Sequence, residues 1–161
     1  MSIYYDNLQQ PIKKPEDAPV QWRMSVYGIL SDEQGRWFMV EPSRVKQWDL
    51  PGGGIEIDES IRDGLAREFY EETGYRVRVV GEPLYLGENP FFYKPLGFCH
   101  SVILIFDVEL IDNVRHEDVV NTFDDGFEIR RGEWVDPAAL TQQDVHPIYW
   151  PFIETWQRRK T

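Results

Sequence analysis

Short apolar runs separated by polar turn clusters make up most of the chain, and one stretch near its centre repeats apolar residues at every fourth position. Apolar residues between Met24 and Leu30 predict a strand, and Ser31–Gly35 is a turn cluster. The apolar run Arg36–Val40 then predicts the returning strand of a hairpin. Three further strands are predicted, at Tyr75–Leu86, His100–Leu110 and Phe127–Val135. The segments between them are predicted loops, at Glu41–Lys46, Pro90–Gly97 and Ile111–Asp125.

The central stretch predicts an amphipathic helix. Its apolar stripe has the spacing of successive helix turns and consists of Ile61, Leu65 and Phe69. Asp58 and Ser60 are candidate N-caps, because their side-chain oxygens can accept hydrogen bonds from the first free backbone N–H groups. Gly74 supplies the C-terminal stop, since glycine easily adopts the left-handed conformation that ends many helices.

The ends of the chain differ in character from its middle. Residues 1–20 are polar and contain three prolines, which predicts an N-terminal arm or an edge segment. Residues 21–161 then form a single predicted domain, because a chain of 161 residues leaves little room for two. Short helices are predicted at 137–140 and 147–159. Strands outnumber helices, so the predicted fold class is α/β, with helices packed on a mixed sheet.

Composition and charge exclude several classes of protein. The formal net charge is −11, which argues against non-specific nucleic-acid binding and against a partner membrane of anionic lipid. The single cysteine, Cys99, excludes an internal disulfide framework and a multi-cysteine zinc site. The apolar run 102–106 is far shorter than the ~20 residues of a membrane-spanning helix. We therefore expect a cytoplasmic globular protein.

Three acidic residues crowd the predicted C-terminal end of the central helix. They are Glu68, Glu71 and Glu72. The helix dipole places partial negative charge at that end, so each acid there costs typically ~0.3–1 kcal/mol. A solvated acidic face is one interpretation of this cluster. The other is a site for a divalent cation, and oxygen ligands favour Mg²⁺, Mn²⁺ or Ca²⁺ over zinc.

A glycine turn ahead of the helix strengthens the second interpretation. Gly52-Gly53-Gly54 allows the backbone to approach a metal or a phosphate closely. Gly53 is followed after five residues by Glu59, and after seven more by the run REFYEETGY, which ends at Tyr75. This span resembles the Nudix box, G-x5-E-x7-R-E-U-x-E-E-x-G-U, at all seven fixed positions. Chance agreement at one register is of order 10⁻⁸ at average residue frequencies. The bulky positions U carry Phe69 and Tyr75 instead of Leu, Ile or Val.

The resemblance to the Nudix family implies both a fold and a chemistry. The fold is an α/β/α sandwich with a mixed central sheet. The activity is hydrolysis of a pyrophosphate bond in a nucleoside diphosphate linked to another moiety, with Mg²⁺ as the cofactor and Mn²⁺ as its substitute. Glu68, Glu71 and Glu72 would be metal ligands with a catalytic role, and the Gly53 carbonyl a further ligand. Two residues, Glu59 and Arg67, would support the metal shell.

The charge of the box agrees with metal-dependent chemistry. Residues 53–75 contain seven acids against two bases. Such a surface repels a pyrophosphate unless cations lie between them. A bound metal neutralises charge, activates water and holds the phosphoryl oxygens, which is most of what phosphoryl transfer requires.

A late carboxylate is the candidate for an additional catalytic group. Many members of the family add one after the box, and here Glu128 lies six residues before Trp134. A surface position on a strand is an equally good interpretation of Glu128. The acidic loop supplies competing candidates, which are Glu117, Asp118, Asp124 and Asp125.

The substrate itself is less clearly encoded. Cations ahead of the glycines could meet phosphates, although exposed solubilising charge is the more common reason for such residues. An aromatic loop could stack on a base, and a place in the core or at an interface is an equally good interpretation of its rings. The candidates are Arg23, Arg44, Lys46 and Tyr93. Pro90 and Tyr93 lie near positions that in the family indicate ADP-ribose and dinucleoside polyphosphates respectively, so the two signals conflict. The predicted partner is a nucleotide-type small molecule, and a homodimer is left open. The alternative function is a catalytically weak Nudix-like domain that binds or senses a nucleotide.

Overall fold

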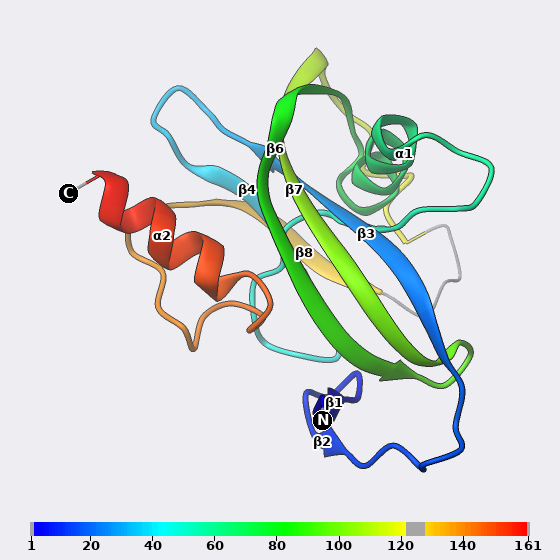
Figure 1. Ribbon diagram of the computed structural model, residues 1–161. Coiled ribbons are helices and arrows are strands. Elements are labelled where there is room, and N and C mark those ends of the chain that lie inside the picture. Colours follow the sequence, from blue (N-terminus) through cyan, green and yellow to red (C-terminus); the bar gives the residue numbers. More distant parts are fainter. Residues whose placement is uncertain (1, 122–127, 161) are drawn as a thin grey trace.

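A six-stranded mixed sheet lies between two helices in the computed structural model, which describes residues 2–121 and 128–160 (Figure 1). The strands are β1 (Tyr4–Tyr5), β2 (Pro11–Ile12), β3 (Val20–Leu30), β4 (Trp37–Pro42), β5 (Gly52–Gly54), β6 (Tyr75–Tyr93), β7 (Gly97–Arg115) and β8 (Ile129–Val135), and the helices are α1 (Ile61–Thr73) and α2 (Trp150–Lys160). The large sheet has the order β2-β1-β6-β7-β3-β5, and β4 pairs with β8 in a second sheet. Because β3 and β7 are parallel while β6 and β7 are antiparallel, the predicted mixed sheet is confirmed.

Each helix covers its own face of the large sheet. On the face of α1, Leu65 and Phe69 pack with Val26 and Phe106, and all four side chains are buried. On the opposite face, the fully buried Ile153 of α2 packs in a cluster with sheet residues such as Ile105. Side chains on a strand alternate between faces, so the single sheet supplies both cores. The predicted α/β/α sandwich is therefore confirmed.

The predicted hairpin between the first two apolar runs forms only at its turn, and its ladder is wrong. Among the described residues, an isolated bridge joins Ser31 to Trp37, and the Asp32 N–H donates a hydrogen bond to the Arg36 carbonyl at 2.9 Å. β3 is already bordered by β7 on one side and by β5 on the other, so β4 pairs with β8 instead. All six residues of β4 are buried. Its side chains alternate between the two cores, so that Phe38 packs in the core under α1 and Trp37 in the core under α2.

Several predicted loops are strands. β6 continues through the aromatic run Phe91-Phe92-Tyr93, and β7 continues to Arg115, into the predicted acidic loop. Long antiparallel pairing carries both strands past residues that usually break them, with a register shift between Val80 and Tyr85. The short helix predicted at 137–140 is also wrong, because those residues form a turn. No helix among the described residues is long and apolar enough to cross a membrane.

The N-terminal arm is anchored to the sheet. Tyr5 pairs in parallel register with Phe91 of β6, and the buried Tyr4 ring packs edge-on against Phe98, with ring centroids 5.2 Å apart. This agrees with an edge segment. The proposed domain boundary at residue 20 falls where β3 begins.

His146 gives the fold a pH dependence that can be measured. Burial, with a smaller contribution from Arg44, lowers the pKa of His146 to about 4, and its Nδ1 accepts a hydrogen bond from the Ile148 N–H. A histidine whose pKa is lower when folded adds stability above its unfolded pKa of ~6.5 and loses it as the pH falls. We therefore expect the free energy of unfolding to fall between about pH 6.5 and pH 4. The variant His146→Gln lacks this titrating group. Urea titrations between about pH 6.5 and pH 4 should therefore show that the free energy of unfolding falls more steeply for the wild type than for the variant. Parallel pH dependences of the two proteins would contradict this assignment.

Candidate active site

The ends of α1 set the positions of the box carboxylates. Ser60 is the N-cap: its Oγ accepts a hydrogen bond from the Asp63 N–H (3.1 Å) and donates one to Asp63 Oδ2 (2.7 Å). Gly74 caps the other end with φ of 75°, and its N–H donates to the Tyr70 carbonyl. Both caps agree with the sequence prediction, with Ser60 the N-cap of the two candidates. The helix thus begins and ends where the box register requires.

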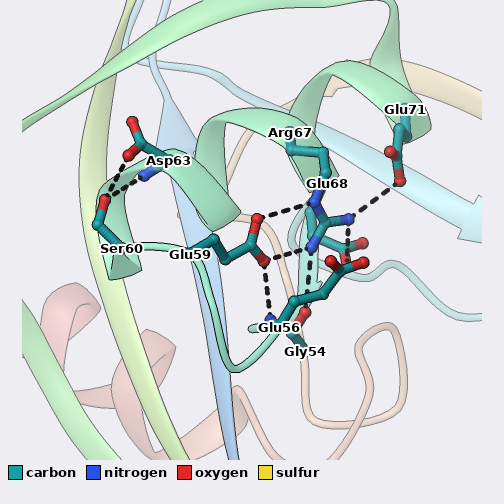
Figure 2. Close-up of polar contacts among 8 residues, drawn as sticks. All are labelled: Gly54, Glu56, Glu59, Ser60, Asp63, Arg67, Glu68 and Glu71. Carbon is teal, nitrogen blue, oxygen red and sulfur yellow. Dashed lines mark hydrogen bonds and ion pairs between the residues drawn. The ribbon is translucent and has the colours of Figure 1, made fainter.

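Arg67 lies at the centre of the acidic cluster (Figure 2). Its Nη2 is 2.6 Å from Glu59 Oε1, and its Nη1 is 2.9 Å from Glu68 Oε1 and 3.3 Å from Glu71 Oε2. A second bond joins Nε to Glu59 Oε2 at 3.1 Å, which makes this pair bidentate. The Glu56 N–H also donates to Glu59 Oε1 at 2.8 Å. One guanidinium therefore holds three carboxylates that would otherwise repel one another.

The charges of this cluster shift its proton affinities. The hydrogen bond from Arg67 holds the pKa of Glu59 below its usual range, and Glu59 in turn raises the pKa of Arg67. Both groups are therefore ionised at neutral pH. The side chains of Glu59, Glu68 and Glu71 are between 14% and 19% exposed, so solvent reaches the cluster without fully screening it.

The glycine turn fits closely against this cluster. A Cβ on Gly53 would lie 2.6 Å from Glu68 Oε2, and a Cβ on Gly54 would lie 1.9 Å from Arg23 Nη2. Gly52 has φ of 144° and donates its N–H to Glu72 Oε2 at 2.9 Å. The absence of side chains thus lets the backbone approach the carboxylates of α1 closely.

These residues fit a hard divalent cation in their chemistry. Glu68, Glu71, Glu72 and the Gly53 backbone offer oxygen donors only, which suit Mg²⁺ or Mn²⁺. In the described part of the chain, no group of three or more Asp, Glu, His or Cys side chains is arranged to hold a metal ion. The hydrogen bonds given above explain this, because Arg67 holds Glu68 and Glu71 while the Gly52 N–H holds Glu72. Metal binding therefore requires exchange of these bonds.

Gly53→Ala tests the glycine turn. Its backbone lies outside the left-handed region, so the added methyl group conflicts only with the carboxylate of Glu68, the far end of a flexible side chain. We expect a Tm close to that of the wild type and apparent Mg²⁺ affinity reduced by about 10-fold, as for loss of a metal-site contact. Measurement of activity against Mg²⁺ concentration checks this. In the double variant Gly53→Ala with Glu68→Gln, the losses of Mg²⁺ affinity caused by the two single changes should be less than additive. Full additivity would contradict the view that the added methyl group acts by displacing Glu68.

Glu128 immediately precedes β8 and is exposed. Its carbonyl accepts a hydrogen bond from the Ser43 N–H at 2.8 Å, and the Asn121 side chain bonds both the N–H and the carbonyl of Ile129 at 2.6 Å. The backbone is thus held at the Glu128 carbonyl and at the following residue, Ile129. Among its competitors, Glu117 is exposed and paired with Arg115, Asp118 is exposed, and Asp124 and Asp125 lie outside the described residues.

The two arginines that follow Glu128 depart from the alternation of a regular strand. Arg130 and Arg131 should point to opposite faces, but both form ion pairs with the buried Glu41. A register shift between Glu41 and Pro42 explains how neighbouring residues of β8 reach one carboxylate. Arg131 also lies over the Trp48 ring, 4.8 Å from its centroid. It is therefore part of the packing between β4 and β8.

The predicted substrate residues do not gather in one place. Arg23 lies against Gly54, beside the acidic cluster. Arg44 lies near Asp49 and His146, since its positive charge opposes the rise in the pKa of Asp49 and adds to the fall in the pKa of His146. Lys46 is exposed in its loop, and Tyr93 is at the end of β6. Of these four, the structure brings Arg23 alone to the glycine turn.

Sequence analysis missed a buried polar atom on Asp49, three residues ahead of Gly52. Burial raises the pKa of Asp49 to about 7, although Arg44 opposes the shift, and Asp49 Oδ1 is buried without a hydrogen bond. Burial likewise raises the pKa of Tyr27 to about 12. The run Trp48-Asp49-Leu50-Pro51 offered no signal for this, because an aspartate before a turn is ordinarily exposed.

Comparisons with known proteins agree with the geometry. A family model of the NUDIX domain matches residues 21–156. A MutT-like protein of Streptomyces ambofaciens is 40% identical over 70 residues, which are 42% of this chain and 46% of that protein. An RNA pyrophosphohydrolase of Methylococcus capsulatus is 40% identical over 53 residues, 33% of this chain and 28% of that protein. The crystal structure of a MutT protein from Methanosarcina mazei Go1 matches with a TM-score of 0.65 and 22% identity, over 90% of this chain and 99% of that one.

The match to residues 21–156 covers most of the chain, so the chain belongs to the NUDIX domain family. The family predicted from Gly53–Tyr75 is thereby confirmed. The likeness to the solved structure shows the fold, at an identity too low to carry more. The chain spans less than half the length of the two curated relatives described above.

Proposed function

We propose that the protein hydrolyses a pyrophosphate bond in a nucleotide or nucleotide derivative, with Mg²⁺ or Mn²⁺ as the cofactor. The observation that carries this proposal is the Arg67-centred cluster of Glu59, Glu68 and Glu71 against the glycine turn. Membership of the NUDIX domain family supports it, as does the RNA pyrophosphohydrolase among the relatives.

In this proposal each box residue has a separate task. Glu68, Glu71, Glu72 and the Gly53 carbonyl would hold the metal, while Glu59 and Arg67 keep the carboxylates in position. When bound, the metal supplies charge neutralisation and an activated water. Arg67 offsets the mutual repulsion of Glu68 and Glu71 while no cation is bound, so both side chains stay beside the glycine turn.

Glu128 is proposed as the additional catalytic carboxylate. Its backbone is held by Ser43 and, through Ile129, by Asn121, which suits a positioned general base. Such a base typically contributes 10²–10⁴-fold, so Glu128→Gln should lower kcat by at least about 100-fold and change KM little. Steady-state kinetics of Glu128→Gln and Glu117→Gln check the assignment. A normal kcat in the first variant and a low one in the second would move the role to the loop.

We also propose a cellular location and an assembly. The buried free thiol of Cys99 suits a reducing compartment, which supports a cytoplasmic location. We also propose a homodimer, and measurement of the molar mass by light scattering tests it.

Phosphate release from a panel of nucleotides, with and without Mg²⁺, tests the proposed function. The expected result is Mg²⁺-dependent hydrolysis of at least one nucleotide, with both products identified by mass spectrometry. Tight nucleotide binding without turnover would instead favour the alternative of a sensor domain.

A further inference from the structure

An open pocket of about 340 Å³ is lined by the end of β7, the start of β8 and residues 117–121 between them. Among the residues that the structure describes, its lining includes Arg115, Arg130 and Arg131 around Gly132, and its acidic group is Glu117. None of these residues belongs to the acidic cluster of α1 or to the glycine turn. Such a group of arginines is unexpected in a chain with 17 basic and 28 acidic residues.

Two of the three arginines share a single buried counter-charge. Arg130 and Arg131 both form ion pairs with Glu41, which is 3% exposed. The other partners of Arg131 and Arg115 are glutamates that are 51% and 74% exposed. Exposed ion pairs are weak, because solvent and salt screen them. The pocket therefore has more positive charge than its buried surroundings neutralise.

Contacts with the protein already hold the guanidinium groups in place. Arg115 donates through Nε to the Thr73 carbonyl at 3.0 Å, and its guanidinium lies 5.1 Å from the centroid of the Phe38 ring. Arg131 lies over the Trp48 ring. Each guanidinium has five N–H donors, and the three side chains are between 27% and 49% exposed, so further donors can reach a ligand. Ordered groups lose little conformational entropy when a ligand binds.

We propose that this pocket binds a phosphate-type oxyanion, either free phosphate or the phosphate group of a nucleotide. Guanidinium groups match the oxygens of such ions in geometry and charge. Here they come from two strands, which suits a tetrahedral ion better than a planar carboxylate. A nucleic acid would need many more cations than this chain of net charge −11 offers. The inference goes beyond the proposed hydrolysis, because it requires no metal.

Inorganic phosphate in EDTA is the probe, since without metal the acidic cluster of α1 repels anions. We expect about 20 mM phosphate to raise the Tm by at least about 2 °C over sodium chloride of equal ionic strength, because it binds the folded state. Sodium acetate should give a much smaller rise. Calorimetry with phosphate and with adenosine 5′-monophosphate then distinguishes the two sources. Equal affinities indicate the free ion, and tighter binding of the monophosphate indicates a nucleotide.

Two variants locate the bound ion. Arg130→Met leaves Arg131 paired with Glu41 and should weaken phosphate binding about 10-fold, the scale of one charge-assisted hydrogen bond. Arg115→Lys keeps the charge but loses the planar fork, and it should weaken binding as well. Arg78→Met is the control, because Arg78 pairs with Glu109 and does not line the pocket.

An unchanged Tm in phosphate, an equal rise in acetate, or a phosphate response that Arg130→Met leaves intact would overturn the inference. A response that is lost in Arg23→Met instead would also overturn it, because Arg23 lies beside the glycine turn. Failure of the proposed function is a separate result. In that case the wild type hydrolyses no nucleotide, while the phosphate response that depends on Arg130 persists.

Discussion

Replacing Glu72 or Glu71 with glutamine is expected to lower kcat by at least about 100-fold, because each change removes an oxygen anion of the proposed metal site. The fold should survive. The glutamine carbonyl at position 72 can still accept the Gly52 N–H, and the loss of a negative charge at the C-terminal end of α1 relieves repulsion there. The measurement is steady-state kinetics on the nucleotide that the panel identifies, with thermal unfolding of each variant.

Glu154→Gln is the matched control. Glu154 lies on α2, on the other face of the sheet, and forms an exposed pair with Arg158. Its kcat should equal that of the wild type. Near-normal kcat in both Glu71→Gln and Glu72→Gln would remove the metal site from α1.

Arg67→Met should lower the Tm in the absence of metal and make the protein unusually responsive to Mg²⁺. Breaking a buried ion pair costs ~3–5 kcal/mol, but Arg67 is 29% exposed, so we expect about 1–2 kcal/mol. For a protein of this size that corresponds to roughly 2–8 °C. Because Glu59, Glu68 and Glu71 then lack their cation, Mg²⁺ should restore more stability to the variant than it adds to the wild type.

Differential scanning fluorimetry in EDTA and in excess Mg²⁺ measures both effects. Arg78→Met is the control, since its pair with Glu109 is largely exposed and contributes little. An Arg67→Met protein that melts like the wild type in EDTA would show that the ion pairs do not hold the carboxylates together. An equal Mg²⁺ response in both proteins would place the cation elsewhere.

Features set by neighbouring residues could be predicted from the sequence, and features set by distant residues could not. The limits of α1 follow from Ser60 and Gly74, whose capping bonds reach only three or four residues along the chain. The partner of β4 was not predictable in this way, because its ladder with β8 joins residues almost a hundred positions apart. The apolar run Arg36–Val40 predicted a strand correctly, and nothing within it indicated which edge it would join.

In the candidate site, too, local spacing was predictable from the sequence and exposure to solvent was not. The spacing of the box residues placed the carboxylates on one end of α1, since helix geometry fixes neighbours at three and four residues. The exposure of the apolar residues at the start of β3 could not be predicted from the sequence. Trp22, Met24 and Val26 alternate as three apolar residues of one strand face, yet Val26 is fully buried while Trp22 is 72% exposed. Exposure along that face depends on which segments α1 covers, which a strand pattern does not encode.

Hydrolysis in oxygen-18 water tests the central claim most directly, that the cluster of α1 serves metal-dependent cleavage of a pyrophosphate bond. The nucleotide that the panel identifies is incubated with the wild type and Mg²⁺, and the products are analysed by mass spectrometry. We expect one oxygen-18 atom in a phosphate group of one product, no reaction in EDTA, and at least about 100-fold slower label incorporation by Glu71→Gln. Label incorporation that persists in EDTA, or that Glu71→Gln leaves unchanged, would contradict the claim.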